Sequence, residues 1–282
     1  MKNIKFNPIE EKTLNDKLVN LYGAKIPGLY SAVKPLFDKP NAVKPALPLL
    51  IELKDDESYE NADLRVMVFG RETNNWDDQE HRKQFPFYTY NFNLTTSDDV
   101  VTEIMGRHVD GEDDYFGLGD IYHDYCYEET GVRKTIFTRH QNQLIQQLKD
   151  RLGGLKVEVL WNNVLKIGRG GKAFGECCGK PWAEIREIER EYFNVVAEEV
   201  GILKPDVIIF LTGYEADQEI REIFNLTPGD FNLVKEGVFL HRINIPGIKY
   251  AARTIHPSSR RSKEDLTKHF DALVDDIVNA IR

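Results

Sequence analysis

The chain has 282 residues, of which 41% are hydrophobic and 29% charged, the ordinary balance of a soluble globular protein. Its formal net charge of −9 argues against broad, non-specific coating of nucleic acid. Three cysteines argue against a disulfide framework and exclude a four-cysteine metal or iron–sulfur site within one chain. Because no apolar run reaches the length of a membrane span and the first residues lack a signal-peptide core, we expect a cytoplasmic protein without a membrane partner.

The first 60 residues are expected to form a helical wrap around the outside of the fold. Apolar residues recur at helical spacing from about Pro8 to Tyr22, and prolines from Pro27 to Pro48 predict short helices and turns after that helix. The apolar, β-branched run Leu64–Phe69 then predicts a buried strand of a parallel sheet. We expect this strand to stop at Gly70, since glycine allows a sharp turn or a close approach to the backbone.

After this strand, residues 77–131 are polar and aromatic and predict an insertion of irregular or short helical structure. Helical and strand patterns alternate beyond it. The predicted elements are a helix at Lys134–Leu152, a strand at Val157–Trp161 ending in Asn162 and Asn163, a helix at Trp182–Val200, a strand at Val207–Leu211, a helix at Tyr214–Phe224, a hairpin of Gly237–Ile243 and Lys249–Ile255, and a helix at Lys263–Arg282.

This alternation predicts an α/β protein with three α/β/α layers and a mainly parallel central sheet of about four strands. Neither an internal repeat nor a convincing linker interrupts the pattern, so we expect residues 1–282 to form a single domain. Within it, residues 1–60 are the wrap and residues 77–131 the insertion. We also expect a monomer.

Polar residues gather where the predicted strands end. They are Glu72 with Asn74, Asn162 with Asn163, Gly213, and the run His256-Pro257-Ser258. Taken singly, each is explained as a capping or turn residue. In a parallel sheet, however, the carboxyl ends of the strands meet at one edge, where ligands bind. A carboxylate, an amide and an imidazole at that edge can form one site.

These stretches, in this order, resemble the motifs of the uracil-DNA glycosylase superfamily from about residue 63 onward. The motifs are Gly70-Arg71-Glu72-Thr73-Asn74 after the first strand, Leu160-Trp161-Asn162-Asn163-Val164-Leu165 at the second, Lys204-Pro205-Asp206-Val207-Ile208-Ile209 at the third, and His256-Pro257-Ser258-Ser259-Arg260 before the last helix. The resemblance implies the fold of that superfamily. It also implies removal of a base, a pyrimidine in the better-known members, from DNA or a related nucleoside.

The resemblance implies roles for individual residues, and the chemistry suits each of them. Glu72 would orient water and stabilise positive charge on the sugar, and His256 would donate a hydrogen bond to the leaving base. Asn162 would read one edge of a flipped base, with Asn74 nearby. Phe85 and Phe87 are candidates for stacking on the base, although core packing is the commoner role of aromatic residues.

Two basic blocks flank these residues and are candidates for holding phosphate groups. The candidate residues are Lys166, Arg169 and Lys172 after Asn162, and Ser258, Arg260 and Arg261 after His256, in a block that begins at Arg253. Solvated surface charge is the alternative for both blocks. The implied partner is single-stranded or damaged DNA, or a nucleotide, and neither a metal nor another cofactor is expected.

Several departures from the superfamily pattern keep other functions open. Thr73 stands where better-known members have proline, and the Ser258–Arg261 segment lacks an apolar wedge for opening a duplex. A module of the same fold that binds a nucleotide or single strand without cleaving it is therefore the main alternative. An interaction protein that uses the acidic 77–131 stretch is a third possibility. The run Gly168–Lys172 lacks the residue spacing of a phosphate-binding loop. His123 and Cys126 have the spacing of metal ligands, but a second pair of metal ligands is missing nearby in the sequence.

Overall fold

The computed structural model describes residues 6–38, 45–46, 48–72, 118–127, 136–168, 180–259 and 261–282. The chain divides into two compact units, which are described one at a time. The first unit takes its described residues from Met1–Lys54, Glu72–Glu128 and Leu165–Ile202. The second takes them from Asp55–Arg71, Glu129–Val164 and Leu203–Arg282. Whether the chain is one domain stays a prediction.

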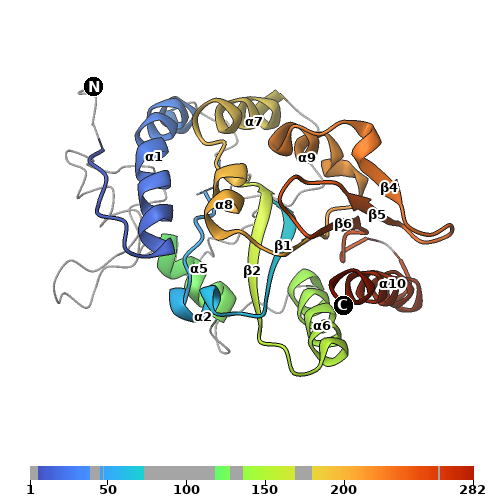
Figure 1. Cartoon of the computed structure of the whole chain (residues 1–282). Coiled ribbons are helices and arrows are strands. Elements are labelled where there is room, and N and C mark those ends of the chain that lie inside the picture. The colour runs from blue at the N-terminus through green and yellow to red at the C-terminus, as the bar shows by residue number, and fades with distance from the viewer. Residues whose placement is uncertain are drawn as a thin grey trace. The chain divides into compact units, whose positions relative to one another are not determined.

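The first unit is helical (Figure 1). Its helices are α1 at Leu14–Asp38, α5 at Leu118–Tyr127, α7 at Lys180–Tyr192 and α8 at Val196–Leu203, whose last residue is counted with the second unit. The helix α5 lies within the predicted 77–131 insertion, and the rest of that insertion lies outside the described residues.

The helix α1 corrects the expectation of a short helix followed by proline-rich turns. It begins at Leu14 rather than at Pro8 and continues to Asp38 with Pro27 and Pro35 inside it. Apolar residues keep the helical spacing past Tyr22 and are buried, namely Ile26, Leu29, Tyr30, Val33 and Leu36. Their burial outweighs the backbone hydrogen bonds that the two prolines remove.

The predicted helix Trp182–Val200 is two helices, α7 and α8, with a break at residues 193–195. Phe193 and Val195 on either side of Asn194 are both fully buried. Two residues that are two positions apart lie on opposite sides of a continuous helix, so both cannot face one core unless the helix is interrupted. Gly201, expected to end the helix, lies inside α8 instead.

The second unit holds the sheet and the helices that cover it. Its helices are α2 at Asp56–Glu60, α6 at Ile136–Leu152, α9 at Asp217–Phe224 and α10 at Lys263–Ile281, with short 3-10 turns η4 at Tyr214–Ala216 and η5 at Pro228–Asp230. Its strands are β1 at Leu64–Glu72, β2 at Val157–Leu165, β3 at Val207–Phe210, β4 at Phe231–Leu233, β5 at Leu240–Ile243 and β6 at Tyr250–Thr254. The last residues of β1 and β2 are counted with the first unit.

The strands form one six-stranded sheet in the order β2-β1-β3-β6-β5-β4 (Figure 1). The β1–β3 and β3–β6 pairs are parallel, whereas β4, β5 and β6 pair antiparallel. The α/β class, the mainly parallel sheet and the β5–β6 hairpin are therefore confirmed, and the count of about four strands is wrong. The short strand β4 was not predicted, because three residues are too few to show an alternating pattern.

Helices cover both faces of the sheet in the second unit. On one face, Val66 and Val68 of β1 join Val207 and Ile209 of β3 in a core that includes apolar residues of α6 and α10. On the other face, Phe69 stacks on Phe210 at 4.9 Å between ring centroids, and Phe224 of α9 meets Phe210 edge-on at 6.1 Å. This core fixes the register in which β1, β3 and β6 end side by side.

Candidate functional site

The carboxyl ends of β1, β3 and β6 lie together at one edge of the sheet. Phe69, Phe210 and Arg253 are abreast in the register of the three parallel strands. The backbone N–H of Gly213, just after β3, donates to the carbonyl of Thr254 at 2.9 Å. The chain segments that follow the three strands are therefore held close to one another, as expected for a parallel sheet.

His256 lies at this edge as a partly buried, uncharged imidazole. The backbone N–H of Ser258 donates to its Nδ1 at 3.1 Å, so the proton of the neutral ring belongs on Nε2. Burial, and then the positive charge of Arg71, lower the pKa of His256 to about 4. The ring of Phe137, from α6, lies 5.6 Å from the imidazole centroid. At neutral pH the Nε2 atom of His256 is thus a hydrogen-bond donor.

Arg71 is fixed in place beside this histidine. Its Nε donates to the carbonyl of Thr212 at 2.8 Å, and its Nη1 forms an ion pair with Glu215 of η4. Only 17% of the Arg71 side chain is exposed. A β-carbon on Gly213 would lie 3.8 Å from Arg71 Nη2 and 3.9 Å from the backbone nitrogen of His256, so one glycine separates the guanidinium from the histidine backbone.

The two asparagines of β2 are the main correction to the predicted site. The sequence placed them at the end of a strand, but β2 continues to Leu165, so Asn162 and Asn163 are inside it and point to opposite faces. Asn162 is fully buried, and its Oδ1 accepts the backbone N–H of Asn163 at 2.8 Å. Its Nδ2 lies 3.7 Å from Met67 Sδ. The amide of Asn162 is therefore occupied by contacts within the protein.

Asn163 is the amide with unused hydrogen-bonding capacity. It is fully buried, and among the described residues neither its Oδ1 nor its Nδ2 has a hydrogen-bond partner. A buried unpaired amide costs on the order of 1–3 kcal/mol. A ligand whose edge carries one donor and one acceptor would remove that cost.

Gly70 explains how the Asn163 amide fits there. A β-carbon on Gly70 would lie 2.5 Å from Asn163 Oδ1 and 3.2 Å from Phe137 Cζ. Gly70 lies inside β1 rather than ending the strand as expected, and its φ is not positive. The glycine is therefore needed for close approach, not for a turn. Phe137 thus lies near the open side of Gly70, and its ring also lies near His256.

The other predicted site residues are placed as follows. Glu72 is the last residue of β1, two positions after Gly70, and is counted with the first unit. Ser258 contributes its backbone N–H to His256, while its side chain is exposed. Arg261 is exposed and pairs with Asp265 of α10 at 2.6 Å. Lying outside the described residues are Asn74, Phe85, Phe87, Arg169, Lys172 and Arg260. The proposed roles of all these residues stay predictions.

Lys166 does not fit its predicted role in holding phosphate. Its side chain is fully buried in the first unit, where Nζ pairs with Glu199 Oε1 at 2.7 Å. The hydroxyl of Tyr22 donates to the same oxygen at 2.6 Å. The ammonium therefore completes a buried polar cluster instead of facing a phosphate. Burial of the charge lowers the pKa of Lys166, and Glu199 opposes that effect.

Arg253, the first residue of the second basic block, is also a core residue. Its Nη2 donates to Asp217 Oδ2 at 3.0 Å, and its guanidinium carbon lies 4.6 Å from the centroid of Phe239. Only 4% of the residue is exposed. A run of basic residues in the sequence therefore does not correspond to one basic surface.

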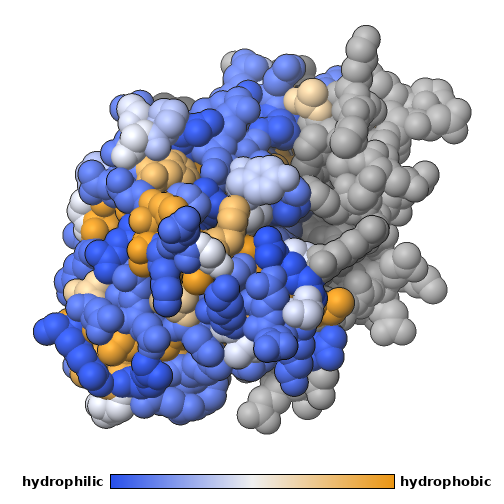
Figure 2. Space-filling model, turned by 90° about the vertical axis from the view of Figure 1, so that its right-hand side faces the viewer, coloured by the Kyte–Doolittle hydropathy of each residue, from blue (hydrophilic) through white to orange (hydrophobic). Residues whose placement is uncertain are grey.

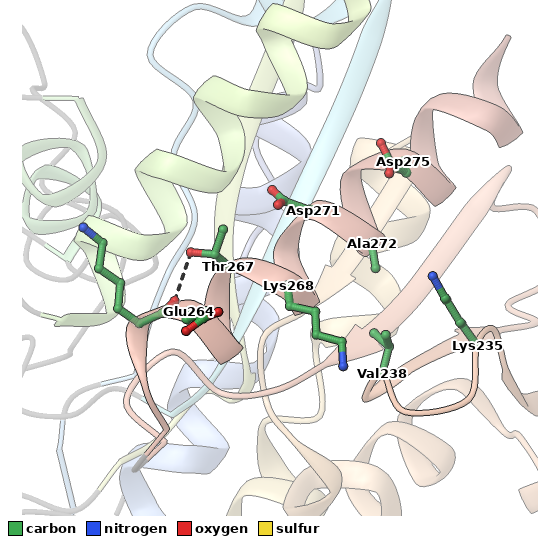
Figure 3. A pocket seen from close by; sticks show the side chains of 9 residues that line it. Lys235, Val238, Glu264, Thr267, Lys268, Asp271, Ala272 and Asp275 are labelled. Carbon is green, nitrogen blue, oxygen red and sulfur yellow. Dashed lines mark hydrogen bonds between the residues drawn. The ribbon is translucent and has the colours of Figure 1, made fainter.

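A surface hollow of about 710 Å³ lies elsewhere in the second unit, between α10 and the connection of β4 to β5. Figure 3 shows Lys268 of α10 extending toward Val238 and Lys235 of that connection. Three lysines and three acidic residues line the hollow, and all six are exposed. On the side shown in Figure 2, the described surface is mainly hydrophilic, with hydrophobic residues in small groups. The hollow contains none of the residues of the candidate site.

Asn163 was named among the polar residues at the strand ends but was given no role, and Phe137 and Arg71 were not expected to contribute. The role of Asn163 could have been found by extending the predicted strand β2 two residues further. The role of Arg71 could have been found from its position directly after Gly70. No sequence signal brings Phe137 to the site, because that contact is made in three dimensions.

No protein-family model matches the chain, and no curated protein matches it. In the described part of the chain, no group of three or more histidine, cysteine or acidic residues is arranged to hold a metal ion, and no helix is long and apolar enough to cross a membrane.

Proposed function

We propose that the chain is an N-glycosidic hydrolase that removes a base, such as a pyrimidine, from DNA or a related nucleoside. One observation carries this proposal: at the carboxyl edge of the sheet, the Asn163 amide, which has no hydrogen-bond partner among the described residues, lies over Gly70 near Phe137, and the ring of Phe137 lies near the uncharged imidazole of His256. The edge of a base offers the donor and acceptor that the amide lacks. The superfamily resemblance of the sequence supports the same assignment.

The chemistry asks two things of the site. Hydrolysis forms a bond from a water oxygen to the anomeric carbon and breaks the bond from that carbon to the base nitrogen, whose electron pair leaves with the base. A donor at His256 Nε2 stabilises the negative charge that develops on the base oxygen. Because the imidazole is already neutral at physiological pH, it can donate a hydrogen bond without transferring its proton.

The remaining role is taken from the sequence motif, which gives it to Glu72. As the acidic residue two positions after Gly70, it would orient the water, accept its proton and stabilise positive charge on the sugar. Asn163 replaces Asn162 as the proposed base-reading amide, since Asn162 is engaged with the Asn163 backbone and Met67. Phe137 is a described aromatic residue near both Gly70 and His256.

The unpaired amide equally favours a module that binds a base without cleaving it. A substrate panel separates the two functions: single-stranded oligonucleotides carrying uracil, hypoxanthine or a 5-substituted uracil, assayed for both binding and abasic product. Abasic product from one of them supports the hydrolase. Salt-sensitive binding without product supports the binding module, and the absence of both contradicts the proposed site.

A further inference from the structure

The surroundings of Arg71 distinguish it from an ordinary surface arginine. Its Nε is bonded to a backbone carbonyl, that of Thr212, and its Nη1 to the carboxylate of Glu215. Both partners come from the segment that follows β3, whereas Arg71 itself belongs to β1. The arginine therefore joins the ends of two neighbouring strands, and its side chain has lost most of its freedom to move.

The segment that Arg71 holds is the one against which His256 packs. Gly213, between Thr212 and η4, bonds to the Thr254 carbonyl and lies close to the His256 backbone. In the described part of the chain, the imidazole also lies near the uncharged ring of Phe137 from α6 and accepts the backbone N–H of Ser258. Among the described residues, Arg71 from β1 is the charged group that lowers the pKa of His256. Glu215 from η4 forms an ion pair with Arg71 and so influences His256 indirectly.

We propose that Arg71 is the positioning residue of this site. Held by Glu215 and the Thr212 carbonyl, its guanidinium keeps the Gly213 segment against His256, and its positive charge adds to burial in opposing protonation of the imidazole. The imidazole then presents Nε2–H as a fixed donor. This inference rests on the proposed function for its catalytic meaning, but the effect of Arg71 on His256 exists without any substrate.

The test measures the ionisation of His256 directly, by NMR titration of the full chain labelled in its histidine rings. The resonance of His256 is assigned by its loss in His256→Asn. In Arg71→Gln, the pKa of His256 should rise by about one, the size of effect expected from one nearby charge. It should stay below the ordinary value of 6.5, because burial is the larger cause of the shift. In Arg71→Lys, which keeps the charge, it should stay near the wild-type value.

A merely structural role for Arg71 gives a different result. Arg71→Gln would then unfold at a lower denaturant concentration with the pKa of His256 unchanged, and the proposal would be overturned. Should Arg71→Gln fail to fold, Glu215→Gln decides the question. Removing the carboxylate strengthens the field of Arg71, so the pKa of His256 should fall, and an unchanged or higher value would contradict the proposal.

Activity assays separate this inference from the proposed function. If the wild-type chain cleaves none of the oligonucleotides but the titrations behave as expected, the hydrolase assignment fails and the positioning role of Arg71 stands. If the wild type cleaves a substrate and Arg71→Gln leaves both the rate and its pH profile unchanged, the positioning role fails and the hydrolase assignment stands.

Discussion

The Oδ1 atom of Asn163 lies 2.5 Å from the point that a β-carbon on Gly70 would occupy. The side chain of Asn163 can lie over β1 at this point only because Gly70 has no side chain. This arrangement places an amide without a hydrogen-bond partner among the described residues at the carboxyl edge of the sheet, where the ring of Phe137 also lies 5.6 Å from the imidazole of His256.

Gly70→Ala should destabilise the protein by about 1–3 kcal/mol, because the added methyl group forces Asn163 or Phe137 to move within a packed core. Urea unfolding measures the change. Gly201→Ala is the matched control: Gly201 lies inside α8, and nothing is within 4 Å of its added β-carbon. That change should stabilise by about 0.5–1 kcal/mol through helix propensity. Equal effects of the two substitutions would contradict the close contact at Gly70.

Asn163→Leu should stabilise the fold by about 1–3 kcal/mol, since it replaces a buried unpaired amide by an apolar group of similar size. The same change should abolish recognition of the ligand. Asn162→Leu should instead lower stability, because the Asn162 amide is bonded to the Asn163 backbone. Thermal unfolding and oligonucleotide binding, measured on both variants, test the pair. A destabilised Asn163→Leu would mean that its amide has a partner within the fold.

Stability should fall as the pH drops from about 6.5 to about 4 because of His256. Its pKa is lowered from 6.5 to about 4 in the folded protein, so between those values the unfolded chain binds a proton that the native ring does not. The stabilisation is complete above pH 6.5 and is lost as the pH falls, by at most about 3 kcal/mol. The free energy of unfolding, measured by urea at several pH values, should decline less steeply in His256→Asn. Parallel curves for the two proteins would argue against a neutral, buried imidazole.

Lys166→Met should cost about 3–5 kcal/mol, because it leaves Glu199 charged and buried without its cation. The double variant Lys166→Met/Glu199→Gln should recover much of that loss. Lys12→Met provides the control, since Lys12 pairs with Glu10 on the surface and should contribute less than about 1 kcal/mol. A Lys166→Met protein of normal stability but weaker, less salt-sensitive DNA binding would restore the phosphate role predicted from the sequence.

The sequence predicted the order of elements because that order depends on local patterns. The parallel strands Leu64–Phe69 and Val207–Leu211 and the closing helix were recognisable from their apolar spacing. The sequence did not predict which way each side chain of β2 points. Neighbouring strand residues point to opposite faces of the sheet, so Asn162 and Asn163 differ in the face on which their amides lie. The edge at which His256 lies followed from sheet topology, whereas the contributions of Asn163, Phe137 and Arg71 there did not.

The contribution of Phe137 and the burial of Lys166 could not be foreseen for a different reason. Both depend on contacts between segments distant in sequence: Phe137 with His256, and Lys166 with Glu199 and Tyr22. A basic residue in a polar stretch looks the same in sequence whether it is solvated or buried beside a carboxylate. Charge patterning alone therefore overestimated the phosphate-binding surface.

The most direct test of the proposed hydrolase is the rate of abasic-site formation on the best oligonucleotide substrate under single-turnover conditions. Wild type should form product, and Glu72→Gln and His256→Asn should each be slower by about 100-fold or more. The control Glu236→Gln, on an exposed residue, should match wild type. Wild-type rates in both site variants, with their folds intact, would contradict the assignment of Glu72 and His256 and with it the central claim.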